Sequence, residues 1–261
     1  MRSATLEKLT DSDIEALEKA LAARPTKQFE AIVDAETIRV RAAMRTFLED
    51  IEPDIKKVSF HELVMATSDL AVDVMEPAAI NAAASAAETW NLPPSAARTA
   101  TSLAPQAAAE TINSEQVARN IRWALSPLVD DALDPVAAFR KAVSQTQDTT
   151  GRRVQGAARE AGLVVAQREG NRIRAVSIPR GPTCPWCLTM ATRADLKHSK
   201  SKDVWHPNCD CSIQLTAMGA KPAGINLLAA DLYSDSEKWA ELTKWINDKT
   251  RVAEDHDWTS N

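Results

Sequence analysis

The stretch CPWC at residues 184–187, followed eighteen residues later by HPNCDC at residues 206–211, holds all four cysteines of this 261-residue chain. A C-x2-C turn places two sulfurs where both can reach one ion, and a second cluster about twenty residues on completes a tetrahedral shell. Thiolates are soft ligands that favour zinc over hard ions such as magnesium. We therefore expect one structural zinc site, whose candidate ligands are Cys184, Cys187, His206, Cys209 and Cys211.

Five candidates compete for four positions in a tetrahedral shell. In extended backbone, Cys209 and Cys211 would point to the same face with their sulfurs about 6–7 Å apart, which is too far for two zinc ligands. Either the strand twists there or one cysteine stands outside the shell. We rank Cys184, Cys187 and Cys211 first and Cys209 last; His206, between them, either binds the ion or orients a ligand.

Other uses of the cysteines stay open. A catalytic metal would need a vacant position for water, which four protein ligands do not leave. A disulfide scaffold fits poorly, because the chain looks cytosolic and a helical protein of this length needs no staples. A redox C-x-x-C would lie on a thioredoxin-like sheet, and nothing in the sequence predicts one.

The composition indicates a mainly α protein. Aromatic residues make up 5% of the chain and there are seven glycines, whereas sandwiches and barrels need many strand aromatics and turn glycines. The chain is rich in residues that favour helices. It has no apolar run of 18 residues, so we expect no membrane partner. The first twenty residues lack the apolar stretch of a secretory signal, so we expect folding in a cytosol.

Apolar residues at three- and four-residue spacing predict consecutive helices through the first 150 residues. We expect helices to begin at Thr10 or Asp11, at Thr26, near Phe60, at Pro77, at Ser114 and at Asp134-Pro135. The prolines and serines between Asn91 and Pro105 predict a loop between subdomains. The expected organisation is a helical region (1–92), a helical connector (93–150), a small α+β zinc-binding module (151–218) and a C-terminal helical segment (219–261).

Strands are expected only around the cysteines. A helix from about Gly151 to Arg168 should end at Gly170, a natural left-handed residue. Residues 172–178 and 212–216 then read as short strands that could pair. A last helix should begin near Ser234, with Glu237 completing a capping box.

Charge is distributed unevenly along the chain. Residues 151–204 contain eleven Lys and Arg against four Asp and Glu, a net charge of +7, which leaves −12 for the remainder of a chain of net −5. This asymmetry suggests that two parts of the molecule face different surroundings. The segment faces packaged DNA or an acidic protein surface, or it is simply a solvated basic face.

Catalytic motifs are otherwise absent from the sequence. His61-Glu62 lacks the second histidine of H-E-x-x-H, and no H-x-E tripeptide precedes Cys184 as zinc deaminases require. No G-x-S-x-G, phosphate loop or dinucleotide fingerprint occurs. We name no catalytic residue and favour a protein without enzymatic activity, while enzymatic activity stays an open question.

The cysteine stretches and their flanks resemble a known family. The runs RGPTCPWCLTMATR (180–193) and WHPNCDCSI (205–213) resemble the phage Mu F-like minor head proteins, most closely the branch in tailed phages of actinobacteria. In that family a helical N-terminal region leads into a compact module with C-x2-C and H-x2-C-x-C. The resemblance covers residues 151–218. Asp210 stands where an arginine is frequent, and Ala194 where a glycine is frequent.

The resemblance implies a head morphogenesis protein incorporated into the virion head, near the portal and the inner capsid surface. The implied partners are the portal protein, the major capsid protein or both, with packaged DNA as a further partner of the basic segment. Assembly would take place in the host cytoplasm. Some relatives are labelled capsid maturation proteases, so a protease acting on the prohead is an alternative, as is a DNA-binding protein of the head interior.

Overall fold

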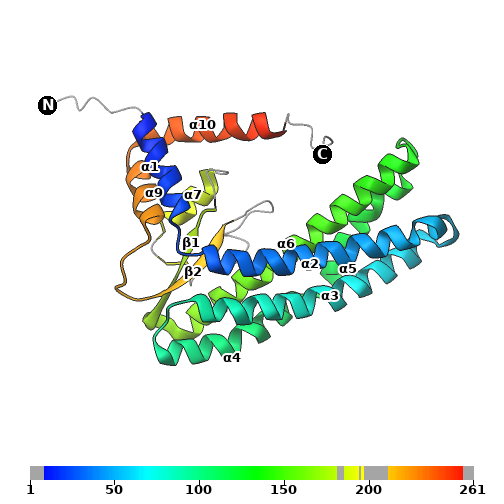
Figure 1. Cartoon of the computed structure of the whole chain (residues 1–261), viewed down its shortest axis with the longest axis horizontal. Helices are drawn as coiled ribbons and strands as arrows, with labels where there is room; N and C mark the ends of the chain where they lie inside the picture. Colours follow the sequence, from blue (N-terminus) through cyan, green and yellow to red (C-terminus); the bar gives the residue numbers. More distant parts are fainter. Residues whose placement is uncertain (1–8, 181–184, 194, 197–210, 255–261) are drawn as a thin grey trace. The chain divides into compact units, whose positions relative to one another are not determined.

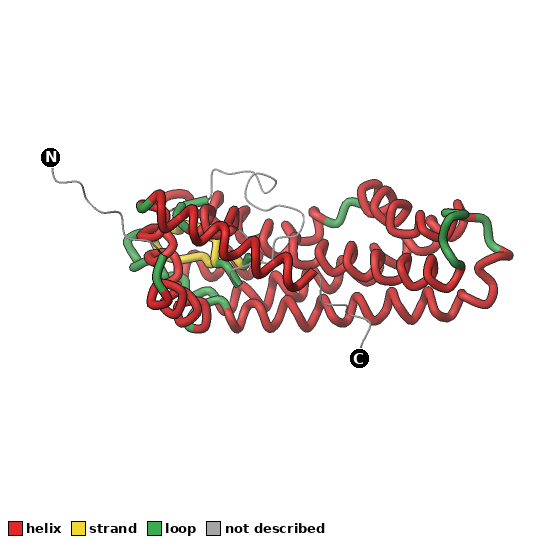
Figure 2. Tube along the Cα trace, turned by 90° about the horizontal axis from the view of Figure 1, so that it is seen from above, coloured by secondary structure: helices red, strands yellow, loops and turns green. Residues whose placement is uncertain are grey.

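The computed structural model describes residues 9–180, 185–193, 195–196 and 211–254, and this part of the chain is mainly helical, as the composition predicts (Figure 2). The elements, with 3-10 turns written η, are α1 (Asp11–Ala22), α2 (Lys27–Ile51), η1 (Glu52–Lys57), α3 (Phe60–Thr89), α4 (Pro94–Thr111), α5 (Ser114–Leu125), η2 (Ser126–Val129), α6 (Pro135–Glu169), η3 (Gly170–Arg172), β1 (Ile173–Ile178), α7 (Pro185–Ala191), β2 (Ser212–Ala217), α9 (Gly224–Ser234) and α10 (Ser236–Glu254).

These elements form two compact units. Unit 1 comprises Met1–Lys27 and Ala166–Asn261, and unit 2 comprises Gln28–Val165. The expected boundaries at 92/93 and 150/151 lie inside unit 2. Unit 1 is therefore assembled from the first and last parts of the sequence, and all of unit 2 lies between these two parts in sequence order.

Unit 2 is a helical bundle in which α3 packs against α4 and α5 (Figure 1). Small side chains line the contact: α3 buries alanines from Ala71 to Ala87, and α4 buries its own at intervals of three and four residues from Ala96 to Ala108. Alanine favours the helix and lets two helix axes approach closely. At the end of α3, Trp90 stacks on Phe29 of α2 with ring centroids 6.0 Å apart.

The helix expected to begin at Pro77 does not exist as a separate element. Pro77 lies inside α3, which runs without interruption from Phe60 to Thr89. A proline inside a helix removes one hydrogen bond and strains one turn. Here Ala71 and Met75 on one side of it and Ala78 and Ala79 on the other are all buried on the same face. Packing on both sides outweighs the local penalty.

The prediction of a loop between Asn91 and Pro105 is also wrong for most of these residues. Only residues 90–93 connect the helices, and α4 begins with Pro94 in its first turn and contains Pro105. Pro94 suits that position because the first turn has no hydrogen bond to lose. Buried Ala100, Ala104 and Ala108 then continue the helical stripe past Ser102.

The helices expected on either side of residue 150 are one helix, α6. Asp134 caps it as predicted, its Oδ2 accepting from the backbone nitrogens of Val136 and Ala137 at 3.1 Å. Gly151 does not interrupt the helix but lets it approach α2: a Cβ there would lie 2.6 Å from Arg41 Nε and 2.9 Å from Thr37 Cγ2. Gly170 follows α6 with φ +58°, as predicted.

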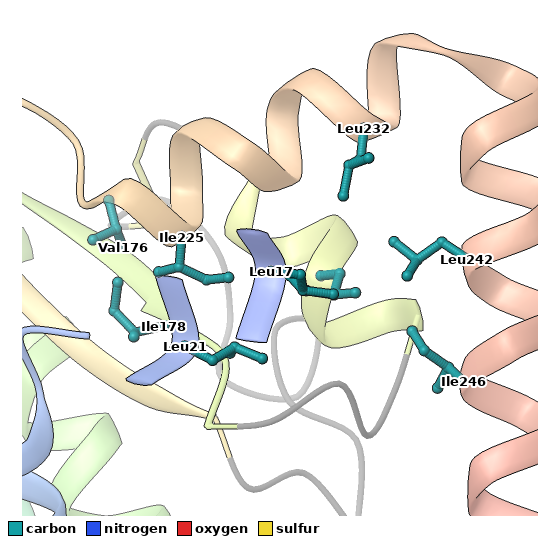
Figure 3. Close-up of a cluster of buried hydrophobic side chains, with 9 residues drawn as sticks. Leu17, Leu21, Val176, Ile178, Ile225, Leu232, Leu242 and Ile246 are labelled. Atoms are coloured by element: carbon teal, nitrogen blue, oxygen red, sulfur yellow. The ribbon is translucent and has the colours of Figure 1, made fainter. Parts of the chain in front are cut away.

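Unit 1 is built around a two-stranded sheet. β1 and β2 pair antiparallel from Ile173↔Ala217 to Ile178↔Ser212, as the two apolar runs predict. One core joins this sheet to α1, α7, α9 and α10, and it consists of Leu17, Leu21, Val176, Ile178, Leu188, Ile225, Leu232, Leu242 and Ile246. Figure 3 shows Leu232, Leu242 and Ile246 pointing from α9 and α10 towards the α1 leucines.

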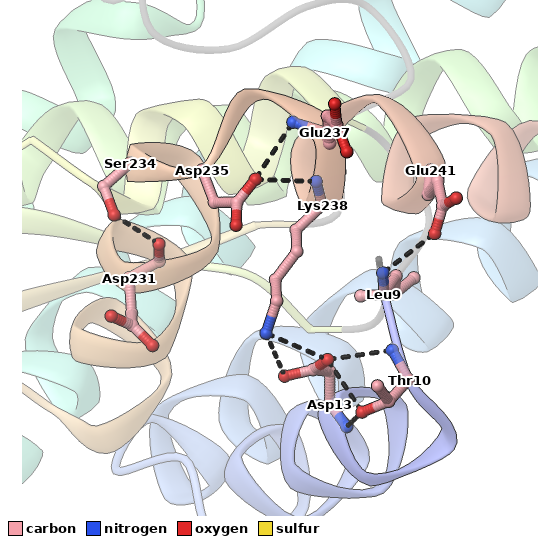
Figure 4. A network of polar contacts seen from close by, with 9 residues as sticks. All are labelled: Leu9, Thr10, Asp13, Asp231, Ser234, Asp235, Glu237, Lys238 and Glu241. Atoms are coloured by element: carbon pink, nitrogen blue, oxygen red, sulfur yellow. Dashed lines mark hydrogen bonds and ion pairs between the residues drawn. The ribbon is translucent and has the colours of Figure 1, made fainter. Parts of the chain in front are cut away.

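The C-terminal helices differ from expectation at their junction. The helix α9 lies within the C-terminal segment (219–261) that is expected to be helical, but Ser234 does not cap the last helix. Its hydroxyl donates to the Asp231 carbonyl inside α9, while Asp235 Oδ1 caps α10 by accepting from Glu237 N at 3.0 Å and Lys238 N at 3.1 Å (Figure 4). Asp235, the residue after Ser234, accepts the hydrogen bonds from the backbone that Ser234 was expected to accept. In the part of the chain that the structure describes, no helix is long and apolar enough to cross a membrane.

Candidate metal centre

The sheet of unit 1 brings the two cysteine stretches to one end. Because the strands are antiparallel, the end of β1 at Ile178 lies beside the start of β2 at Ser212. In the sequence, five residues separate the end of β1 from the first stretch, and the second stretch immediately precedes β2. Pairing of these strands therefore brings together the two strand ends from which the cysteine stretches continue along the chain.

Two of the five candidate ligands lie in the described residues. Cys187 stands in the first turn of α7, which begins with Pro185 and packs against β1. Cys211 stands directly before β2. Both side chains are almost fully buried, with 2% and 3% of their surface exposed. Two thiols are thus buried inside unit 1, one in α7 and one directly before β2.

The other three candidates, Cys184, His206 and Cys209, lie outside the described residues, as do Ala194 and Asp210. Within residues 9–180, 185–193, 195–196 and 211–254, no three His, Cys, Asp or Glu side chains form a group that could hold a metal ion. The donors that are described nevertheless fit zinc, because both are sulfur and both are buried.

A buried asparagine that the sequence analysis missed organises the surroundings of α7. Asn226 of α9 is 7% exposed, and its Nδ2 donates to the carbonyls of Ser177 at 3.0 Å and Ala191 at 2.7 Å. It therefore ties β1, the end of α7 and α9 together. One amide group satisfies two buried carbonyls, which would otherwise be costly. No local pattern marks Asn226, because its partners lie 35 and 49 residues away.

The chain after α7 returns along the outer edge of β1. Ala175 donates its N–H to Asp195 Oδ1 at 3.1 Å, and its carbonyl accepts from Leu196 N at 2.7 Å. These bonds use the edge of β1 that does not face β2. β1 is therefore paired on both sides near its middle, which fixes the path of the chain between the two cysteine stretches at this point.

The basic segment is divided between the two units. Arg153 and Arg159 belong to unit 2, where Arg153 donates to Gln116 Oε1 at 3.1 Å and Arg159 is 8% exposed. Partial burial lowers the pKa of Arg153. Arg168, Arg172 and Arg193 belong to unit 1 and are exposed. The lysines of the segment lie outside the described residues.

Comparison with protein families identifies the chain over most of its length. The VG15 protein family matches residues 5–235.

The chain belongs to the VG15 protein family.

This family consists of viral gene products and indicates a phage-encoded protein. The matched residues include α1 and end at Asp235, so family membership covers elements of both units and not the cysteine region alone. Neither curated proteins nor solved structures yielded a match to the chain.

Proposed function

We propose that this member of the VG15 protein family is a minor head protein of a tailed phage, placed in the head interior near the portal, with a structural zinc site in unit 1. The observation that carries the proposal is the burial of Cys187 in α7, which packs against β1, and of Cys211 directly before β2, within a motif that resembles the Mu F-like module. Family membership supports a phage origin, and the resemblance of the cysteine motif supports a role in the phage head.

The zinc ligands in this proposal are Cys184, Cys187 and Cys211, with His206 as the fourth and Cys209 as the alternative. When bound, zinc supplies roughly 10–16 kcal/mol of apparent folding free energy at neutral pH, enough to shape a small module. Burial of the two described thiols excludes water from them. The proposed site would act by holding the two cysteine stretches together. The zinc-stabilised module would then present the surface that binds the portal or major capsid protein.

Metal analysis tests the site. Purified wild-type protein is expected to contain one zinc ion per chain, and Cys187→Ser and Cys211→Ser to lose it, because each removes a thiolate ligand. His206→Ala has a matched control in His61→Ala, an exposed histidine of α3 in unit 2. Zinc retained by both cysteine variants would contradict the site.

Co-expression with the portal and major capsid proteins of the same phage tests the role in assembly. The wild-type chain is expected in purified heads and Cys187→Ser is not. A wild-type chain that binds zinc but is absent from heads would refute the head assignment and leave the metal site standing. Cleavage of the major capsid protein in the same experiment would favour the maturation protease instead.

DNA is a second partner that we propose for unit 1. Arg168, Arg172 and Arg193 are exposed on it, within the segment of net charge +7. Binding through phosphates should be independent of sequence and should weaken steeply between low and physiological salt. Fluorescence anisotropy with labelled duplex DNA over a salt series measures this, and no binding at low salt would remove DNA as a partner.

A further inference from the structure

Unit 2 contains a groove that neither the metal site nor the basic segment uses. It lies between the region of η1 and the start of α3 on one side and the region of η2 and the start of α6 on the other, with a volume of about 600 Å³. That volume is in the range of sites that bind ligands or peptide side chains. All of its lining belongs to unit 2, so the groove does not depend on the metal.

Apolar side chains line the groove without being buried by the fold. Val58, Val129 and Val136 are 40%, 56% and 53% exposed. Five larger apolar side chains of the lining are only partly buried, namely Ile55, Phe60, Leu128, Leu133 and Phe139. Contiguous apolar surface of this kind, contributed by separate elements and bordered by polar residues, marks a site of protein interaction.

The border of the groove is acidic. Its lining includes Glu52, Asp130 and Asp131 against one base, Lys56. The segments that form it, 52–63 and 128–139, together contain six Asp and Glu and two Lys, a net charge of −4. Nucleic acid would be repelled here, whereas a segment carrying Lys and Arg would be attracted.

We propose that this groove binds a segment of another protein that presents apolar side chains flanked by Lys and Arg, most simply one face of a short helix. Apolar side chains of the segment would cover the exposed valines, as in other helix-in-groove complexes. Its basic residues would lie against Asp130 and Asp131. Asp130 is held in place, because its Oδ1 accepts from Ala132 N at 3.1 Å. The inference goes beyond the proposed role in the head and stands without it.

Two synthetic peptides of about 18 residues, long enough to form a helix, serve as probes. Both carry the same leucine face; one has lysine and the other glutamate at the remaining positions. Titrated into the full chain and followed by fluorescence anisotropy, the lysine peptide is expected to bind saturably and the glutamate peptide not to bind. Absence of saturable binding by the lysine peptide would overturn the proposal.

Matched variants locate the binding. Val129→Ser with Val136→Ser should weaken it by about tenfold or more, because several methyl groups lose their burial. Ile38→Ser, at a 65% exposed position of unit 2 that does not line the groove, should change it less than about twofold. Asp130→Asn with Asp131→Asn should weaken it, while Asp69→Asn with Asp73→Asn on α3 should not.

Equal effects of groove and control variants would show that the peptide binds acidic surface in general, which overturns the proposal. Sedimentation of the unliganded protein supplies a further check. A dimer that Val129→Ser with Val136→Ser dissociates would show that a second copy of the chain occupies the groove, which also overturns it.

Discussion

At the scale of single residues, Asp13 and Lys238 join two helices that are 225 residues apart in the sequence (Figure 4). Lys238 Nζ lies 3.3 Å from both Asp13 carboxylate oxygens, and both side chains are 19% exposed. Asp13 also completes the capping box of α1 with Thr10. Burial acts to raise the pKa of Asp13, but hydrogen bonds from Thr10 and Lys238 outweigh it and lower the pKa.

The substitution Asp13→Asn should destabilise unit 1 in a pH-dependent way. The folded-state pKa of Asp13 is the lower one, so its stabilisation is complete above the unfolded pKa of about 4 and is lost as pH falls through the folded value. We expect a loss of about 1 kcal/mol at pH 7. Urea unfolding of both proteins between pH 7 and pH 3 measures the difference, which should shrink below about pH 4.

The matched control for this change is Asp11→Asn in the same first turn, which is exposed. It should alter the free energy of unfolding by less than about 0.5 kcal/mol. A difference between wild type and Asp13→Asn that stays constant down to pH 3 would contradict the assignment. Taking the difference between the free energies of unfolding of wild type and Asp13→Asn at each pH cancels the acid sensitivity of every other site, because both proteins share those sites.

At the scale of elements, contacts between helices decide where each helix ends. α6 is continuous through Gly151 because the missing side chain lets it lie against Thr37 and Arg41 of α2. Arg41 in turn donates from Nε to the carbonyl of Gln147 at 3.3 Å, and Gln147 donates back to the carbonyl of Arg41 at 3.2 Å. These bonds tie α2 to α6 one turn before the glycine.

Two glycines of α6 allow this contact to be tested against helix propensity. Gly151→Ala should lower the free energy of unfolding by about 1–3 kcal/mol, because the new methyl group overpacks against buried Thr37. Gly156→Ala meets no atom within 4 Å and should raise the free energy of unfolding by about 0.5–1 kcal/mol. Urea unfolding measures both. If both alanines stabilise the protein, the close approach of α2 and α6 is refuted.

At the scale of the whole molecule, unit 1 depends on both ends of the chain. Leu17 and Leu21 of α1 enter the same core as β1, α7, α9 and α10. The Leu9 backbone nitrogen, just before α1, donates to Glu241 Oε2 of α10 at 2.8 Å, which adds a polar contact. Unit 1, which contains both described cysteines, is therefore supported by residues that precede the whole of unit 2 in the sequence.

The substitution Leu17→Ala should consequently loosen elements that follow more than 150 residues later. Leu17 has no exposed surface, and removing a buried leucine side chain costs about 2–5 kcal/mol. Hydrogen exchange should become faster in β1 and α9 and stay unchanged in α3 and α4. Leu227→Ala on α9, where the side chain is 54% exposed, is the control and should leave exchange unchanged. Protection retained in β1 after Leu17→Ala would contradict this core.

Local signals in the sequence predicted a substantial part of this fold. Thr10 and Asp134 act as caps where expected, Gly170 adopts a positive φ, and the two apolar runs pair as strands. Each of these depends on neighbours within a few residues, or on two adjacent runs. The five candidate ligands were also named from spacing alone, because metal binding needs particular residue types at short intervals, and zinc binding by them stays a prediction.

Helix ends at Pro77, Pro105 and Gly151 were not predictable in the same way. In each case a local rule competes with a contact made elsewhere, such as the alanine faces of α3 and α4. Burial of such a face involves many residues and outweighs the penalty of one proline. The partner face must be known before that balance can be evaluated.

The amino-acid sequence by itself determined the helical class, the hairpin, most caps and the clustering of the four cysteines, because these follow from residue types at short range. Only the tertiary structure decided that α1 joins the core of unit 1 and that Asn226 ties α9 to β1 and α7. It also decided that unit 2 has a groove with an apolar lining and an acidic border. These features depend on packing between segments that are far apart in the sequence. The stabilising energy comes from burying their surfaces against each other, and local sequence patterns do not show which segments will meet.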